Sequence, residues 1–126
     1  MTFCLAEASN TNSVDYVGTY AWEKKSPSNL KATFTPVVNS NNVWNVQLEA
    51  LYQNKVSYYI GYAKGSLTGG FKGEANLKGK KRWWTYDVVS TNGVLYGKHW
   101  EKGTQYTGVF VLQVKPSTNI NELVKK

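Results

Sequence analysis

The segment from Gly65 to Leu77 alternates regularly between two kinds of side chain, and this alternation restricts the fold more than any other feature of the chain. From Leu67 onward every second residue is apolar or glycine, and the residues between are Thr, Gly, Lys, Glu and Asn. A period of two residues is typical of a β-strand with one buried face and one solvated face. Because glycines recur on the apolar face, where a curved sheet would crowd side chains, the pattern favours a sheet that bends toward closure.

The same alternation recurs in seven other segments, which are connected by short turns rich in Asn, Gly, Ser and Lys. In addition to Gly65–Leu77, we predict strands at residues 16–23, 30–38, 43–52, 56–64, 81–89, 94–100 and 104–114. The connections are too short for a crossover helix, so neighbouring strands are expected to pair antiparallel. A meander of about eight strands loses its exposed edges when it closes on itself. The predicted fold class is therefore all-β, an up-and-down barrel, with a β-sandwich of two sheets as the alternative.

The length and composition indicate one globular domain. The chain has 126 residues, of which 41% are hydrophobic and 18% charged, and its mean hydropathy is -0.45. These values are typical of a folded domain rather than of a disordered chain, and no apolar run reaches the length that a bilayer requires. We expect the domain at residues 15–115, followed by either a loose tail or a short helix at residues 116–126.

The first eight residues resemble the end of a secretory signal peptide. They are mostly apolar and finish in Ala6-Glu-Ala8, with small residues at the two positions that define a cleavage site. A disordered leader over residues 1–14 is the alternative. Cys4 is the single cysteine, so an intrachain disulfide is excluded, and cleavage after Ala8 would leave no cysteine at all. This segment predicts an exported bacterial protein, located in the periplasm or outside the cell.

Two motifs at the ends of the predicted barrel resemble a known group of folds. Gly18-Thr-Tyr-Ala-Trp22 is similar to the Gly-x-Trp element in the first strand of calycin barrels, such as avidins and lipocalins. The Gly-x-Phe-x-Leu run from Gly108 to Leu112 suits a last strand that closes a barrel. The resemblance implies a small antiparallel barrel of a class whose members bind small molecules at one barrel mouth.

Aromatic residues are the strongest functional signal, since they make up 14% of the chain and recur on the faces that we expect to point inward. An eight-stranded barrel is just wide enough to be filled by side chains or to hold one small ligand. Buried tyrosine hydroxyls need partners, which a half-wet cavity would offer more easily than a solid core. We therefore predict non-catalytic binding of a small, partly apolar or aromatic ligand in the barrel mouth, with a core filled by these rings as the alternative. The predicted ligand-binding residues are Trp44, Tyr58, Tyr62, Trp84, Tyr86, Tyr96, Trp100 and Tyr106.

Positive charge is the second functional signal. The formal net charge is +7, and every cationic residue except Arg82 is a lysine. The segment 78–84 places four cations beside two tryptophans, a combination that binds anionic glycans and single-stranded nucleic acids. The alternative function is therefore polyanion or carbohydrate binding by Lys78, Lys80, Lys81, Arg82 and Trp83. A single guanidinium disfavours nucleic acid as the partner, and a solvated lysine-rich surface is a further interpretation.

Catalytic and metal-binding motifs are scarce. His99 is the only histidine, and we interpret it as a surface residue of a strand. We expect no metal and no cofactor, because a zinc site needs several His or Cys ligands and no glycine-rich phosphate loop precedes a helix. An enzyme of unknown reaction remains an alternative, and His99, Glu101 and Asp87 would be its acid or base candidates.

Overall fold

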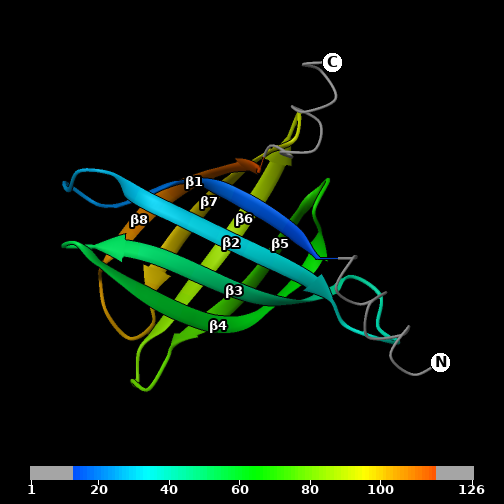
Figure 1. Cartoon of the computed structure of the whole chain (residues 1–126), viewed down its shortest axis with the longest axis horizontal. Coiled ribbons are helices and arrows are strands. Elements are labelled where there is room, and N and C mark those ends of the chain that lie inside the picture. Colours follow the sequence, from blue (N-terminus) through cyan, green and yellow to red (C-terminus); the bar gives the residue numbers. More distant parts are fainter. Residues whose placement is uncertain (1–12, 116–126) are drawn as a thin grey trace, which may run out of the picture.

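The computed structural model describes residues 13–115, which form eight antiparallel strands closed into one barrel (Figure 1). The strands are β1 (Val14–Trp22), β2 (Ser28–Pro36), β3 (Val43–Tyr52), β4 (Lys55–Ser66), β5 (Gly70–Leu77), β6 (Trp83–Thr91), β7 (Val94–Glu101) and β8 (Thr107–Val114). Each strand pairs with the next, and β1 also pairs with β8, from Tyr16 opposite Val114 to Trp22 opposite Gly108. The predicted up-and-down barrel is thereby confirmed, and the alternative of two separate sheets is wrong.

Several expectations about the ends of the chain concern residues 1–12 and 116–126, which lie outside the described residues. The barrel itself runs from Val14 to Val114, and between residues 13 and 115 the chain contains strands and turns but no helix. Accordingly, no helix in this part of the chain is long and apolar enough to cross a membrane. An eight-stranded antiparallel barrel is compatible with the resemblance to calycins.

The central segment differs from its prediction, because the chain reverses at its beginning. β4 continues to Ser66, residues 67–69 form a turn, and β5 starts only at Gly70. The Ser66 hydroxyl oxygen accepts hydrogen bonds from the backbone N–H groups of Thr68 and Gly69, at 3.0 and 3.2 Å. The first residues of the alternating segment, from Leu67, therefore form a turn that the Ser66 side chain closes, and periodicity alone does not reveal such a turn.

Side chains fill the interior of the barrel. The buried residues are Tyr16, Tyr20, Leu30, Ala32, Phe34, Val46, Leu48, Ala50, Ala63, Phe71, Ala75, Trp84, Tyr86, Val88, Leu95, His99, Phe110 and Leu112. The Tyr20 hydroxyl donates a hydrogen bond to the Leu51 carbonyl, and the Tyr86 hydroxyl donates one to the Tyr62 carbonyl, both at 2.8 Å. Burial raises the pKa of Tyr20 to about 12 and that of Tyr86 further, so both hydroxyls stay neutral. These tyrosines thus satisfy their hydroxyl groups inside a packed core.

The face of β4 that points into the barrel is the opposite of the predicted one. Tyr58, Ile60 and Tyr62 are exposed, whereas the alternate residues Gly61 and Ala63 face the core. A Cβ atom on Gly61 would lie 1.9 Å from the Glu74 carbonyl oxygen, so the neighbouring strand leaves no room for a side chain. Tight curvature therefore selects the face with small residues, although the opposite face is more aromatic.

The prediction was also wrong for β7 and for the start of β8. Leu95, Gly97 and His99 point inward, while the predicted Tyr96 and Trp100 lie outside. A Cβ atom on Gly97 would lie 2.2 Å from the Phe110 ring, so that ring occupies the space over the glycine. Tyr106, which was also expected inside, precedes β8 in a turn and is exposed.

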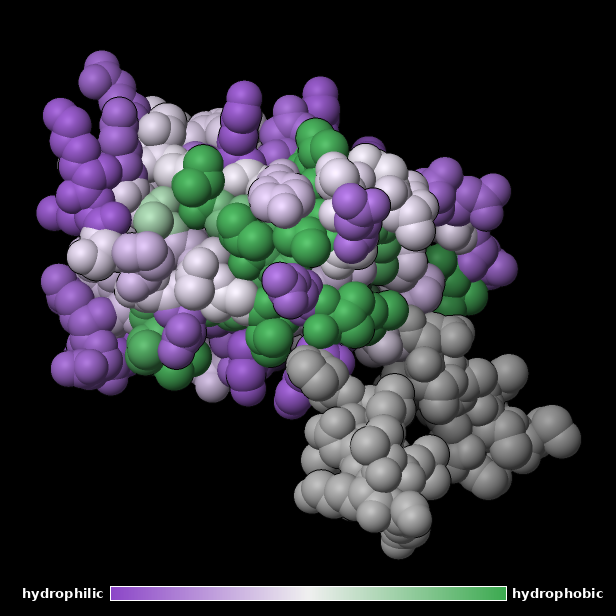
Figure 2. Space-filling view, turned by 90° about the horizontal axis from the view of Figure 1, so that it is seen from above, coloured by the Kyte–Doolittle hydropathy of each residue, from purple (hydrophilic) through white to green (hydrophobic). Residues whose placement is uncertain are grey.

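The outer surface combines apolar and charged regions. Figure 2 shows apolar side chains in the middle of one face and hydrophilic side chains projecting from its left end. Val89, Val109 and Val111 are among the exposed apolar residues of β6 and β8. The outside of the barrel thus presents both apolar and hydrophilic side chains to solvent.

Candidate functional site

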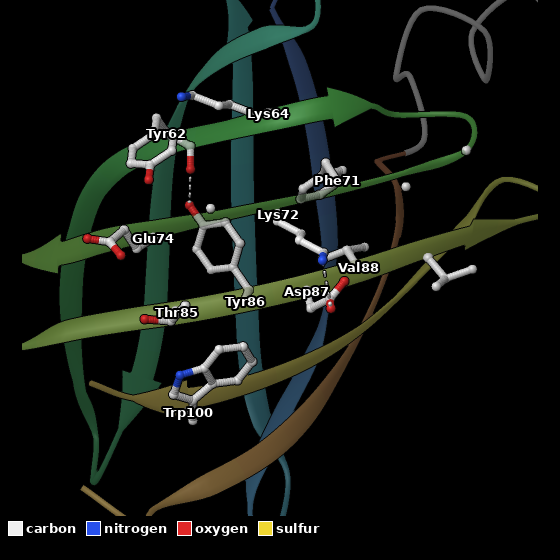
Figure 3. Close-up of a pocket in the computed structure, with 14 residues that line it drawn as sticks. Tyr62, Lys64, Phe71, Lys72, Glu74, Thr85, Tyr86, Asp87, Val88 and Trp100 are labelled. Carbon is white, nitrogen blue, oxygen red and sulfur yellow. Dashed lines mark hydrogen bonds and ion pairs between the residues drawn. The ribbon is translucent and has the colours of Figure 1, made fainter. Parts of the chain in front are cut away.

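A groove of about 800 Å³ lies on the outside of the barrel, across β4, β5, β6 and β7 (Figure 3). Outward-facing side chains of all four strands line it. The backbones of Gly69, Gly70 and Gly73 also contribute to its lining. The groove is the candidate functional site, because concave surfaces with aromatic and polar walls are where small molecules bind.

One row of side chains crosses the groove at right angles to the strands. Tyr62 lies opposite Glu74, Glu74 opposite Thr85, and Thr85 opposite Trp100, so one residue from each strand shares the row. Three strand spacings separate Tyr62 from Trp100, which places their backbones about 14 Å apart. Tyr62 is 39% exposed and Trp100 is 37% exposed. The row therefore has an open aromatic ring at each end and two polar side chains between them.

The charges around the groove are largely balanced. Lys72 Nζ lies 3.9 Å from Asp87 Oδ2, and Lys102 Nζ lies 3.5 Å from Glu74 Oε1. The ammonium group of Lys64 lies 5.7 Å from the centre of the Tyr62 ring. Each carboxylate of the groove thus has a lysine beside it, and the site offers hydrogen-bonding groups without a strong excess of either charge.

The floor of the groove is fixed from inside the barrel. Tyr86 belongs to β6, and its hydroxyl reaches the Tyr62 carbonyl of β4 past Gly73 of β5 (Figure 3). Gly73 permits this, since a Cβ atom there would lie 2.0 Å from the same carbonyl oxygen. The Thr85 hydroxyl is buried and has no hydrogen-bond partner within residues 13–115.

A second cluster surrounds His99 inside one end of the barrel. The histidine is 1% exposed, and its ring lies 4.5 Å from Trp22 and 4.8 Å from Trp84, centre to centre. Burial lowers its pKa to about 4, although the carbonyl groups of Ala21 and Val109 lie near it. Neither ring nitrogen forms a hydrogen bond of good geometry with any described residue. The interpretation of His99 as a surface residue was therefore wrong, because glycine at position 97 and aromatic neighbours place this face of β7 in the core.

The nearby cavity is too small for the ligand predicted in the barrel mouth. It measures about 10 Å³ and lies between Trp22, Tyr59, Trp84 and Glu101. That volume accommodates roughly one water molecule. The cavity and the His99 cluster belong to the packing of this barrel end rather than to a ligand site.

The predicted ligand-binding residues do not converge in a barrel mouth. Tyr62, Tyr86 and Trp100 line the outer groove, and Trp84 is buried in the core. Trp44 is half-buried, and its indole N–H donates a hydrogen bond to the Gly65 carbonyl at 3.0 Å. The remaining three residues are exposed and do not line the groove, namely Tyr58, Tyr96 and Tyr106.

The candidates for the other two functions are also separated. Asp87 lines the outer groove, His99 is buried inside the barrel, and Glu101 lies 4.0 Å from Arg82 at the barrel end. Residues 13–115 contain no group of three or more His, Cys, Asp or Glu side chains arranged to hold a metal ion. The polyanion candidates Lys78, Lys80, Lys81 and Arg82 are exposed in the turn between β5 and β6, and Trp83 is 38% exposed at the start of β6.

Sequence reasoning did not single out Lys72, Glu74 and Thr85 of the groove, and it named Asp87 only as an acid or base candidate of an enzyme. The alternation of β5 and β6 did identify them as outward-facing, but the register that aligns them with Tyr62 and Trp100 was not available from the pattern. Comparisons of the chain with protein-family models, with curated proteins and with solved structures find no match.

Proposed function

We propose that the protein is a non-catalytic binding protein whose outer groove holds an uncharged, ring-shaped ligand, such as a short neutral oligosaccharide. The observation that carries this proposal is the row across the groove, with Tyr62 and Trp100 at its ends and Glu74 and Thr85 between them. Open aromatic rings separated by polar groups match a ligand that has both apolar faces and hydroxyl groups.

Sugar rings have this combination of surfaces. Their C–H groups form faces that pack on Tyr or Trp rings, and their hydroxyl groups bond to carboxylates, hydroxyls and ammonium groups. The ion pairs Lys72–Asp87 and Lys102–Glu74 favour a neutral ligand, because a charged one would compete with a partner already present. The width of about 14 Å between the aromatic backbones fits two linked rings rather than one.

This proposal keeps the non-catalytic binding expected from the sequence, but it replaces the partly apolar or aromatic ligand with a neutral oligosaccharide and moves the site from the barrel mouth to the outer wall. A ligand in the barrel mouth is disfavoured, because side chains fill the interior and the cavity near Trp84 measures only about 10 Å³. A relation to calycin barrels is part of the proposal, and the pairing of β1 with β8 supports it. The exported location indicated by residues 1–8 is also part of the proposal. Export would expose the groove to extracellular glycans.

We expect Trp100→Ala to weaken binding of a neutral oligosaccharide about tenfold, a loss of about 1.4 kcal/mol, because it removes one stacking wall. Cello-, xylo-, manno- and chito-oligosaccharides serve as probes in calorimetric titrations. Trp83→Ala is the matched control, since Trp83 is equally exposed but does not line the groove. Equal losses in the two variants, or no loss in Trp100→Ala, would refute the assignment of the groove.

A further inference from the structure

The cationic residues of the barrel concentrate at one of its ends. In an up-and-down barrel, the turns after β1, β3, β5 and β7 share one end. Lys24 and Lys25 follow β1, Lys55 follows the turn after β3, and Lys102 follows β7. The turn at residues 78–82 adds three lysines and Arg82. These turns define what we call the basic end, which lies on the left of Figure 1.

The opposite end has a different character. Its turns, at residues 37–42, 67–69 and 92–93, contain no charged residue. β1 begins there and β8 ends there, because Tyr16 pairs with Val114. The barrel strands thus enter and leave at the uncharged end, and the basic end is formed by turns alone. Among the described residues, most of the cations are therefore at one end of the barrel rather than spread evenly along it.

Few of these cations are neutralised within the protein. Arg82 Nε lies 4.0 Å from Glu101 Oε2, and Lys102 pairs with Glu74. Within residues 13–115, Lys24, Lys25 and Lys55 have no ion-pair partner, and neither do the lysines of the turn 78–82. The only carboxylates close to this end in the sequence are Glu23 and Glu101. An unpaired cluster of this kind attracts anions over distances of about a Debye length.

We propose that the basic end binds a linear acidic polysaccharide, one that carries carboxylate or sulfate groups along its chain. Lysine ammonium groups act as hydrated point charges on flexible stems, so they respond to the charge density of a polymer rather than to the geometry of one group. Cations from four separate turns can contact successive charges of one such chain. This surface is distinct from the groove, and its function does not depend on what the groove binds.

The shape of the basic end favours a polysaccharide over nucleic acid. Its turns are short, so it has no helix or long hairpin to enter a duplex groove. Single-stranded nucleic acids need aromatic rings beside the cations on which bases stack. Exposed aromatic rings do border these turns, at Tyr52, Trp83 and Tyr106, but each belongs to a different turn, and the one guanidinium among the cations lies beside Glu101.

The test compares two variants with the same net charge. One carries Lys24→Glu, Lys80→Glu and Lys81→Glu at the basic end, and the other carries Lys31→Glu, Lys98→Glu and Lys115→Glu elsewhere. Heparin and polygalacturonate are titrated against both variants and the wild type, at 50 mM and 200 mM salt. We expect the first variant to lose about 100-fold or more in affinity for the polysaccharide that the wild type binds, and the second less than about tenfold.

Three outcomes would overturn the proposal. Equal losses in the two variants would mean that overall charge, not the basic end, attracts the polymer. Tighter binding of single-stranded DNA or of phosphatidylserine vesicles than of both polysaccharides would identify another partner. Binding of neither polysaccharide by the wild type would remove the function altogether. Neutral oligosaccharides are titrated in parallel, so that a failure here is distinguished from a failure of the groove.

Discussion

Replacing Gly73 with alanine is expected to destabilise the barrel by about 3 kcal/mol or more. The new Cβ atom would lie 2.0 Å from the Tyr62 carbonyl oxygen and 2.9 Å from Ala63 Cα. Both are backbone atoms of β4, so no side chain can rotate away. The strands would have to separate, and the hydrogen bond from Tyr86 to the same carbonyl would be lost. Urea unfolding followed by tryptophan fluorescence measures the change.

Gly69→Ala is the matched control for this prediction. A Cβ atom on Gly69 would meet only the Ser66 side chain, at 3.9 Å, which is an ordinary van der Waals distance. We expect its free energy of unfolding to stay within about 0.5 kcal/mol of the wild type. A Gly73 variant as stable as the Gly69 variant would contradict the close approach of β4 and β5.

Acidification from pH 6.5 to pH 4 is expected to reduce the free energy of unfolding by about 3 kcal/mol through His99 alone. Burial lowers the pKa of His99 from its ordinary value of 6.5 to about 4 in the folded protein. Between these values the unfolded chain binds a proton that the folded chain does not, so protonation favours unfolding. The contribution is complete above about pH 6.5, declines as the pH falls, and is lost near pH 4.

His99→Leu isolates this effect, because an apolar side chain in the same aromatic surroundings cannot titrate. Urea unfolding at pH 7, 6, 5 and 4 yields one stability curve for each protein. Carboxylates contribute to both curves, so their difference reports His99. We expect the variant to lose less stability than the wild type over this range. Parallel curves would mean that His99 is protonated in the folded state and that its burial is not as described.

The fold was largely predictable, because period-two alternation and short turns indicate strands and antiparallel order directly. Which face of β4 points into the barrel was not predictable, since aromatic or apolar residues occur on both of its faces. Hydrophobicity alone predicted that Tyr58, Ile60 and Tyr62 point inward. In the structure the small residues Gly61 and Ala63 point inward instead, because the closed barrel leaves no room for larger side chains there. The glycines of the central segment had already indicated this curvature, and the same reasoning applied to β4 would have corrected the assignment.

The candidate site was harder to predict than the fold. Alternation assigns a residue to a face but does not say which residue of the next strand lies beside it. The row from Tyr62 to Trp100 depends on the register of three strand pairs, which follows from turn geometry such as the Ser66 turn. The basic end was likewise visible only as the single turn at residues 78–82, because the other cations are distant in sequence and meet only when the barrel closes.

The most direct test of a ligand groove on the outside of a filled barrel is an NMR titration that follows the indole N–H signals. The protein has five tryptophans, of which Trp100 lines the groove, Trp84 is buried in the core, and Trp44 is half-buried against it. Addition of the neutral oligosaccharide that binds best should shift the Trp100 signal and leave those of Trp84 and Trp44 in place. Shifts of the Trp84 and Trp44 signals with an unchanged Trp100 signal would place the ligand inside the barrel and contradict the account.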